Sequence, residues 1–365
     1  MDCKMQKEEI IMKNWEQNVR KVTPYTPGEQ PKQKKVIKLN TNENPYPPSP
    51  AVLAALDGVK ENLADLRKYP DPAAEQLVQA IADFYGRKTS QVFVGVGSDD
   101  VLAMCFLTFF NSERPILFPD ITYSFYDVWA ELFRVPYEKQ PLNEQFEIVK
   151  EDYYKENGGI IFPNPNAPTG ALLPLSAIED VVKHNPDSVV IVDEAYIDFG
   201  GESALPLIDR YDNLLVVQTF SKSRSMAGMR IGYAMGNEQL IKYLSDVKYS
   251  FNSYTMNATA IALGTAAMQD RAYFEETKAK IIATRERAKE RLAALGFSFV
   301  DSRANFIFAA HKSVPAEELF LALKQAGIYV RYFKKPRIDN YLRITIGTDE
   351  EMEELYQFLE HYLAH

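Results

Sequence analysis

Short apolar runs recur through the middle of the chain, and most of their positions are apolar in succession rather than in alternation. They lie at residues 92–94, 115–118, 159–162, 188–192 and 214–218. Strands that are buried on both faces of a parallel sheet have this pattern. Segments with helical periodicity, such as 73–86 and 99–111, lie beside these runs. The pattern predicts the α/β class, with helices on both faces of a mainly parallel central sheet in a three-layer sandwich.

The C-terminal part of the chain predicts a second, smaller α/β domain. It begins with a long helical stretch from Tyr254 to Ala294. Strands are expected at 297–300, 305–310, 329–333 and 341–347, with a helix at 315–327. Thr348 and Glu351 have the spacing of a capping box at the start of a final helix.

The N-terminal residues predict an amphipathic helix followed by an arm rich in proline and lysine. The apolar positions of this helix are Ile10, Ile11, Trp15 and Val19. An arm of this composition usually crosses a surface rather than forming a core. We therefore divide the chain into an N-terminal arm that forms part of the small domain (1–47), a large ligand-binding domain (48–270) and a small C-terminal α/β domain (271–365).

Composition and charge limit the classes of function. The chain has 365 residues, of which 46% are hydrophobic, and its net charge of −9 argues against a general nucleic-acid binder. No apolar run reaches membrane-spanning length, and the charged N-terminus lacks the apolar core of a signal peptide. The two cysteines, Cys3 and Cys105, lie far apart, and the four histidines show no metal-ligand spacing. We expect a cytoplasmic protein without a metal site, a membrane partner or a nucleic-acid partner.

Polar residues follow each of the five apolar runs directly. The segments that follow them are GVGSDD, PDITYSFY, PNPNAPTG, DEAY and TFSK. Ligands of open α/β sheets bind beyond the carboxyl ends of the strands. The sequence therefore predicts that five strand ends surround a single ligand.

The segment GVGSDD has features of an anion site. Gly95 and Gly97 allow a tight turn, and Ser98 and Asp99 would begin a helix whose free N–H groups attract an anion such as phosphate. The dinucleotide fingerprint fails because Asp100 replaces its third glycine, and no P-loop is present. Taken alone, the segment is explained more simply by an aspartate that caps an ordinary helix.

The segment around Lys222 carries a lysine, hydroxyl groups and an arginine. A lysine amine in such a place is a candidate Schiff-base former, since burial or cationic neighbours lower its pKa. Thr219, Ser221 and Arg230 offer two hydroxyl groups and a guanidinium group, which suit a phosphate. An exposed lysine in a serine-rich loop is the alternative. That alternative leaves the polar residues at the other strand ends unexplained.

The segment VDEAY places Asp193 at the end of a strongly apolar strand. A helix cap, a metal ligand or a solvated turn residue are the ordinary roles of such an aspartate, and the absence of nearby histidines disfavours a metal. A carboxylate at a dry strand end also suits a cationic ring nitrogen, and Tyr196 could direct its hydroxyl group into the same space. Pyridoxal phosphate needs a lysine amine, phosphate donors and a carboxylate beside its ring nitrogen. Tyr123 could cover the face of the ring.

At this point the sequence resembles the fold-type I pyridoxal-phosphate aminotransferases, and most closely their histidinol-phosphate branch. The resemblance covers nearly the whole chain, in order. It includes the segments KLNTNENPYPPSP (38–50), KYPDP (68–72), GVGSDDVL (95–102), NPNAPTG (164–170), VDEAYIDF (192–199), TFSKSRSMAGMRIGY (219–233), ANFIF (304–308) and NYLRITIGT (340–348). It implies amino transfer from L-histidinol phosphate to 2-oxoglutarate, which yields imidazole acetol phosphate and glutamate.

The resemblance implies a role for each matching residue. Lys222 would hold the cofactor through its amine, Asp193 would pair with the ring nitrogen, and Tyr196 would hydrogen-bond the ring oxygen. Tyr123 would stack on the ring. The cofactor phosphate would be surrounded by Ser98, Asp99, Thr219, Ser221 and Arg230.

The resemblance also implies how the substrates and a second subunit contribute. Arg343 would clamp the carboxylate of glutamate, and Arg331 would contact the phosphate of the other substrate. Asn42 would belong to the same substrate site. The partner subunit's Tyr69 would reach the neighbouring cofactor and substrate, which implies a homodimer with shared active sites.

Two segments depart from the family pattern. The family usually has N-N-P-T-G, in which the asparagine directly before the proline contacts the ring oxygen, whereas Ala167 occupies that position here. Either Asn166 substitutes for it or Tyr196 serves alone. SKSRS also replaces the commoner SKAFG, although the eight-residue step from Lys222 to Arg230 is kept.

Three other functions compete with this interpretation. An aromatic amino-acid aminotransferase would share the cofactor residues without needing an arginine for a substrate phosphate. A phospho-amino-acid decarboxylase would release carbon dioxide without 2-oxoglutarate. A cofactor-sensing regulator is disfavoured, because the chain shows no additional DNA-binding domain and is acidic overall.

Overall fold

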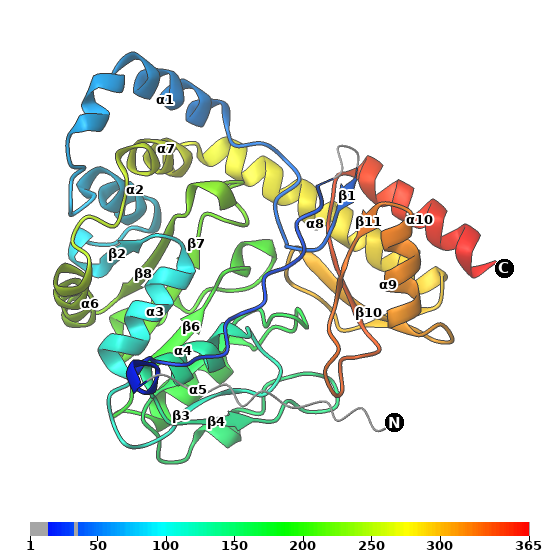
Figure 1. Cartoon of the computed structure of the whole chain (residues 1–365), viewed down its shortest axis with the longest axis horizontal. Helices are drawn as coiled ribbons and strands as arrows, with labels where there is room; N and C mark the ends of the chain where they lie inside the picture. Colours follow the sequence, from blue (N-terminus) through cyan, green and yellow to red (C-terminus); the bar gives the residue numbers. More distant parts are fainter. Residues whose placement is uncertain (1–13, 33–35, 365) are drawn as a thin grey trace, which may run out of the picture.

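The structure is a computed structural model that describes residues 14–32 and 36–364. A seven-stranded sheet with helices on both faces forms one part of the molecule, and two smaller sheets lie beside it with the C-terminal helices (Figure 1). The predicted α/β class with a mainly parallel central sheet is confirmed. Of the helices in the described residues, none is both long and apolar enough to cross a membrane.

The central sheet contains all five of the predicted strands and two more. In spatial order its strands are β2 (Val92–Gly95), β8 (Gly232–Gly236), β7 (Leu214–Thr219), β6 (Val190–Asp193), β5 (Ile160–Pro163), β3 (Ile116–Pro119) and β4 (Tyr137–Gln140). β8 runs antiparallel to both of its neighbours, and the other pairs are parallel. The sequence analysis missed β8 and β4, because GYAMG contains two glycines and YEKQ is mostly polar.

Except in β4, alternate residues of the strands of the central sheet enter two separate hydrophobic clusters. Val190 and Val192 of β6 belong to the cluster on one face, whereas Ile191 belongs to the cluster on the other. The first face is covered by α2 (Glu75–Tyr85), α5 (Leu175–His184) and α7 (Ala258–Gln269). The second face is covered by α3 (Ser98–Phe109), α4 (Phe125–Phe133) and α6 (Glu238–Phe251). Burial on both faces explains why these strands are continuously apolar.

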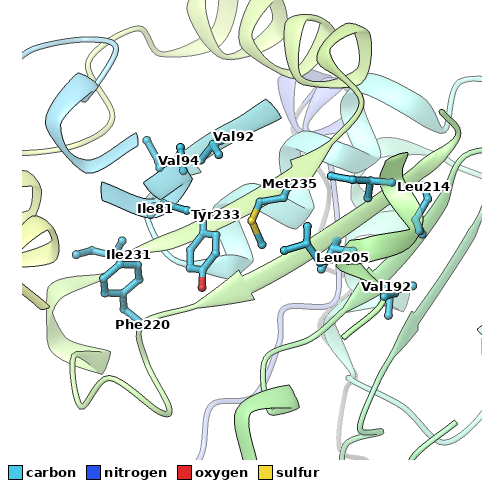
Figure 2. Close-up of a cluster of buried hydrophobic side chains, with 14 of the residues drawn as sticks. Ile81, Val92, Val94, Val192, Leu205, Leu214, Phe220, Ile231, Tyr233 and Met235 are labelled. Carbon is cyan, nitrogen blue, oxygen red and sulfur yellow. The ribbon is translucent and has the colours of Figure 1, made fainter. Parts of the chain in front are cut away.

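Figure 2 shows part of the first cluster around β2, β7 and β8. Tyr233 and Met235 of β8 lie beside Val92 and Val94 of β2, and Leu214 of β7 lies in the same cluster. The hydroxyl of Tyr233 reaches a polar partner, since it donates to Oε1 of Gln218 at 2.8 Å. This packing holds β8 rigidly beside β7.

The smaller sheets join the N-terminal arm to the C-terminal third of the chain. β1 (Ile37–Lys38) pairs in parallel with β11 (Ile328–Tyr329). A four-stranded antiparallel sheet has the order β12 (Arg331–Tyr332), β13 (Leu342–Thr345), β10 (Phe306–His311) and β9 (Phe297–Phe299). Its hydrophobic cluster includes side chains of α8 (Arg271–Ala294), α9 (Ala316–Gln325) and α10 (Asp349–Leu363) together with Leu39. The divisions after residues 47 and 270 stay predictions.

The remaining elements connect these layers. α1 (Pro50–Glu61) packs against α7. The short 3₁₀ helices are η1 (Asn14–Asn18), η2 (Leu63–Arg67), η3 (Thr89–Gln91), η4 (Lys150–Tyr153), η5 (Ile197–Phe199), η6 (Leu205–Asp209) and η7 (Ala227–Met229). Trp15 and Val19 lie exposed at η1. Ile10 and Ile11 of the predicted amphipathic helix lie outside the described residues, as do Cys3 and His365.

Two predicted elements of the C-terminal part are wrong in detail. The helical stretch 254–294 is two helices, because Asp270 ends α7 and its side chain accepts a hydrogen bond from the backbone N–H of Tyr273 at the start of α8. The strand predicted at 329–333 is divided at Val330 between β11 and β12, which belong to different sheets. The capping box of Thr348 and Glu351 is confirmed at the start of α10.

A buried arginine of α8 joins the two parts of the molecule. The side chain of Arg285 is 1% exposed, and its guanidinium group donates to the carbonyl of Phe199 at 2.6 Å and to that of Ala304 at 3.0 Å. Phe199 follows β6 of the central sheet, whereas Ala304 precedes β10 of the small sheet. Arg285 also pairs with the half-exposed Glu286. This side chain therefore ties the loop after β6 to the segment that precedes β10 of the four-stranded sheet.

Replacement of Arg285 tests that connection. Arg285→Met would leave two buried carbonyl groups without their donor, so we expect the free energy of unfolding to fall by about 2–4 kcal/mol in urea titrations. Arg287→Met is the matched control on the same helix, because Arg287 pairs with Asp349 at the surface and its loss should cost less than about 1 kcal/mol. Equal stability of the two variants would contradict the role of Arg285.

Candidate active site

One cavity lies where five strand ends of the central sheet converge. Its volume is about 170 Å³, and its lining comes from the ends of β2, β3, β5, β6 and β7 and the segments that follow them, together with Thr41 and Glu43 after β1. The structure brings nine of the predicted site residues together in this lining. They are Ser98, Asp99, Tyr123, Asp193, Tyr196, Thr219, Ser221, Lys222 and Arg230.

Asp193 presents a buried carboxylate to this cavity from the last position of β6. Its Oδ2 accepts a hydrogen bond from the hydroxyl of Tyr126 at 2.9 Å, and its Oδ1 accepts one from the backbone N–H of Ala195 at 3.2 Å. Burial nevertheless raises the pKa of Asp193 to about 6, although both hydrogen bonds act in the opposite direction. Charge on this carboxylate is therefore costly, and a cation beside it would be stabilising.

Tyr196 is held in the cavity wall by the N-terminal segment. Its hydroxyl accepts a hydrogen bond from Nδ2 of Asn42 at 2.9 Å, and its ring packs edge-on against Phe306. Asn42 is itself fully engaged, because its Oδ1 accepts from the hydroxyl of Thr345 and its carbonyl accepts from Nδ2 of Asn305, each at 3.0 Å. Asn42 thus orients Tyr196 and does not line the cavity.

Lys222 enters the cavity from the loop after β7. Its Nζ donates to the carbonyl of Thr41 at 3.1 Å and lies 5.7 Å from the ring centre of Tyr196. Ser223, the next residue, donates to Oδ2 of Asp198 at 2.5 Å. This contact joins the loop that carries Lys222 to the loop that carries Tyr196. It therefore helps to fix the position of Lys222 relative to Tyr196.

A set of anion-binding groups lies at the end of the cavity nearest α3. Ser98 is the first residue of α3, and Arg230 lies within 3.4 Å of Asp99. The hydroxyls of Thr219 and Ser221 lie 3.0 Å apart beside them. Free N–H groups at a helix start, two hydroxyls and a guanidinium group are a suitable environment for a phosphate.

Two glycines make that arrangement sterically feasible. Gly97 has φ of +85°, and a Cβ there would lie 2.4 Å from a guanidinium nitrogen of Arg230. A Cβ at Gly232 would lie 2.2 Å from the backbone nitrogen of Ser98. A side chain at either position would therefore displace β8 or Arg230 from the start of α3.

Asn166 lies outside this cavity, and Ala167 lines it instead. Nδ2 of Asn166 donates to the carbonyl of Ile121 and to the hydroxyl of Thr169, both at 3.0 Å. Asn166 lines a separate cavity together with Phe146 and Leu173. In this arrangement the side chain of Asn166 does not stand in for the asparagine that the family has at position 167.

Tyr69 lies on the surface, away from the cavity of its own chain. It is 83% exposed, and its ring centre is 4.7 Å from that of Tyr254.

Arg331 and Arg343 face each other across neighbouring strands of the small sheet. Their Cα atoms are direct partners in the pairing of β12 with β13. The guanidinium group of Arg343 donates to the carbonyl of Asn40 at 2.9 Å, but its Nε has no partner. Burial lowers the pKa of Arg343, and the charge of Arg331 lowers it further. Two opposed cations of this kind would be stabilised by an anion.

Arg331 lines a second cavity, which has a volume of about 520 Å³ and is larger than the one that Lys222 enters. Thr122 and Ser124 line this larger cavity, whereas Tyr123 between them lines the smaller one. In the same way, Pro168 lines the larger cavity and Ala167 lines the smaller one. The two cavities therefore lie on opposite sides of the same two segments.

Sequence reasoning missed several residues of these cavities. Tyr126 holds Asp193, Glu43 lines the smaller cavity, and Tyr25 and Arg337 line the larger one. Tyr126 belongs to the first turn of α4, and no local pattern of the sequence indicates its contact with Asp193. Tyr25 and Arg337 reach the site only through tertiary structure and give no local signal.

The residues of the smaller cavity fit pyridoxal phosphate. Asp193 is a buried carboxylate, and none of the ion pairs among the described residues involves it. The amine of Lys222 donates to a carbonyl rather than to a carboxylate, which leaves it available to an aldehyde. The anion-binding groups match a phosphate. Within the described residues, no cluster of histidine, cysteine or carboxylate side chains could hold a metal ion.

Comparison with known proteins agrees with this chemistry. The aminotransferase class I and II family profile matches residues 34–359. Histidinol-phosphate aminotransferase 1 of Hydrogenovibrio crunogenus is 55% identical over 94% of this chain and 96% of its own length. Histidinol-phosphate aminotransferase of Clostridium acetobutylicum is 53% identical over 97% of this chain and 100% of its own length.

The fold is shared with solved structures. Histidinol-phosphate aminotransferase from Sinorhizobium meliloti, in complex with pyridoxal-5'-phosphate, superposes with a TM-score of 0.82. The alignment covers 90% of this chain and 91% of that one, at 22% identity, so it bears on the fold alone. The family profile and the full-length relatives place the chain in the class I and II aminotransferase family, within its histidinol-phosphate aminotransferase branch.

Proposed function

We propose that this protein binds pyridoxal 5'-phosphate in the smaller cavity and transfers the amino group of L-histidinol phosphate to 2-oxoglutarate. The products are imidazole acetol phosphate and glutamate, and the setting is cytoplasmic histidine biosynthesis. The observation that carries the proposal is a buried carboxylate, a lysine amine and an anion-binding helix start in one cavity. The names of relatives at 53% and 55% identity support the choice of substrate.

The cofactor, when bound, supplies an electron sink for the bonds of the substrate α-carbon. Asp193 would keep the ring nitrogen charged, and Tyr196, oriented by Asn42, would hydrogen-bond the ring oxygen. Tyr123 would cover one face of the ring. Arg230 and the start of α3 would hold the phosphate, with the hydroxyls of Thr219 and Ser221 beside it.

Lys222 has two tasks in this proposal. Its Nζ would hold the cofactor before the substrate arrives. After the substrate displaces it, the same nitrogen would take a proton from the substrate carbon and return it to the cofactor carbon. The carbonyl of Thr41 accepts from this nitrogen and would keep it beside the reacting carbon.

The opposed arginines would serve the two substrates in turn. Arg343 would bind a carboxylate of glutamate or 2-oxoglutarate, and Arg331 would bind the phosphate of histidinol phosphate. Asn166 stands outside the cavity, so Tyr196 would serve the ring oxygen without it.

The proposal includes a homodimer with shared active sites. Exposed apolar side chains extend from α1 through η2 to Tyr69 and Tyr254, whose rings are in contact. They are Leu53, Leu56, Leu63, Leu66, Tyr69, Phe251 and Tyr254. A second copy of the chain would cover this surface, and the partner subunit's Tyr69 would complete the cavity.

The proposed reaction is tested with a panel of amino donors and 2-oxoglutarate. Histidinol phosphate should support glutamate formation far better than phenylalanine, and phosphothreonine should release no carbon dioxide. Lys222→Ala should lower turnover by more than about 10³-fold, because both the tether and the proton-transfer base are lost. Preference for phenylalanine, or carbon dioxide release from phosphothreonine, would replace this function with the corresponding alternative.

Replacement of Arg331 tests whether this side chain binds the phosphate of the substrate. Arg331→Ala should lower kcat/KM for histidinol phosphate by about 2–4 kcal/mol, since a charge-assisted bidentate contact is lost. Histidinol, which lacks the phosphate, should lose much less. Lys334→Ala is a nearby control, because Lys334 pairs with Glu317 at the surface. If Arg331→Ala affects the two substrates equally, Arg331 does not bind the phosphate.

Shared active sites are tested by mixing two variants of the protein, Lys222→Ala and Tyr69→Phe. In a mixed dimer of Lys222→Ala and Tyr69→Phe subunits, one site would carry both substitutions and the other would carry neither. Activity should therefore exceed the sum of the parent activities after subunits exchange. Unchanged activity despite demonstrated exchange would mean that Tyr69 does not act across the dimer.

A further inference from the structure

The smaller cavity contains a carboxylate to which the proposed function gives no task. Asp193 faces the expected ring nitrogen, and Asp99 is engaged by Arg230 and by the hydroxyl of Tyr123. Glu43 lines the same cavity and belongs to the segment that follows β1. It therefore reaches the cavity from the N-terminal segment and not from the central sheet.

Glu43 and Lys222 are joined through one intervening residue. The hydroxyl of Thr41 donates to the carboxylate of Glu43, while the carbonyl of Thr41 accepts from Nζ of Lys222 at 3.1 Å. Lys38 pairs with Glu43 and also donates to the hydroxyl of Thr41 at 2.5 Å. The side chains of Lys38 and Glu43 are 25% and 39% exposed, so solvent screens their charges only in part.

The electrostatic environment keeps Glu43 ionised. Burial opposes its charge, but the contacts with Lys38 and Thr41 and the charge of Lys222 lower its pKa overall. The charge of Lys222 is among the contributions that lower the pKa of Glu43, and both groups contact Thr41, so the two charges lie within electrostatic reach of each other.

Other charged and titratable groups line the cavity that Lys222 enters. They are Asp193 on β6, Tyr196 after it, Asp99 on α3, Tyr123 before α4, and Arg230 after η7. In the loaded enzyme, Asp193 would be neutralised by the ring nitrogen, and Arg230 and Asp99 would face the phosphate. Glu43 would then be the carboxylate that acts on Lys222 itself.

We propose that Glu43 is a positioning residue that holds positive charge at the Lys222 nitrogen, with Lys38 moderating its effect. The inference rests on the proposed function, because that nitrogen must carry a proton at two points of the cycle. It does so while it is linked to the cofactor and again after it takes the proton of the substrate carbon. In both cases the carboxylate stabilises the charged form.

Absorbance titration of the cofactor linkage tests this effect in the holoenzyme, independently of turnover. The linkage nitrogen loses its proton as pH rises, and its colour changes. Glu43→Gln removes the negative charge with little change of shape, so the midpoint should fall by about 1 pH unit. Lys38→Met removes the opposing cation, so the midpoint should rise.

The midpoint shifts expected for Glu43→Gln and Lys38→Met have opposite signs, which distinguishes an electrostatic role of Glu43 from a structural one. A purely structural contact predicts no shift, or shifts of the same sign in both variants, and either result would overturn the inference. An unchanged midpoint in Glu43→Gln with an intact linkage would overturn this inference alone. Absence of any cofactor linkage at Lys222 in the wild type would overturn the proposed function together with it.

Discussion

The arrangement of this site depends on one buried carboxylate, that of Asp193 at the end of β6. Burial raises the pKa of Asp193 from 3.8 to about 6, a shift of about 2 units. Since the pKa is higher in the folded state than in the unfolded state, ionisation of Asp193 lowers the stability of the fold by about 3 kcal/mol above pH 6. A cationic ring nitrogen in contact with Asp193 would offset this cost. The buried carboxylate of Asp193 would therefore favour the protonated form of the cofactor's ring nitrogen.

The fold brings the partners of that carboxylate together from distant parts of the chain. Parallel pairing of β5, β6 and β7 places their carboxyl ends on one edge. The reversed strand β8 brings Gly232 against the start of α3, which puts Arg230 beside the free N–H groups there. The N-terminal segment adds Asn42, which orients Tyr196, and Thr41, which orients Lys222. The N-terminal segment and the central sheet thus both contribute to one small cavity.

Much of this site was predictable because residues that directly follow the buried strands of a parallel sheet lie at the same edge of the sheet. Asp193, Tyr196 and Lys222 follow β6 and β7, and their convergence follows from the parallel sheet alone. Position 167 was not predictable, because a shift of one residue decides whether Asn166 faces the cavity or the carbonyl of Ile121. The contact of Asn42 with Thr345 spans 303 residues, and no local pattern indicates it. The break at Asp270 was missed because both flanking segments are strongly helical.

The protonation state of the cofactor ring measures the effect of Asp193 most directly. It can be read from the ¹⁵N chemical shift of the ring nitrogen in enzyme loaded with ¹⁵N-labelled pyridoxal phosphate. The buried carboxylate predicts a protonated nitrogen in the wild type at neutral pH and loss of that proton in Asp193→Asn. An unprotonated nitrogen in the wild type, or an unchanged shift in Asp193→Asn, would show that Asp193 does not act on the ring.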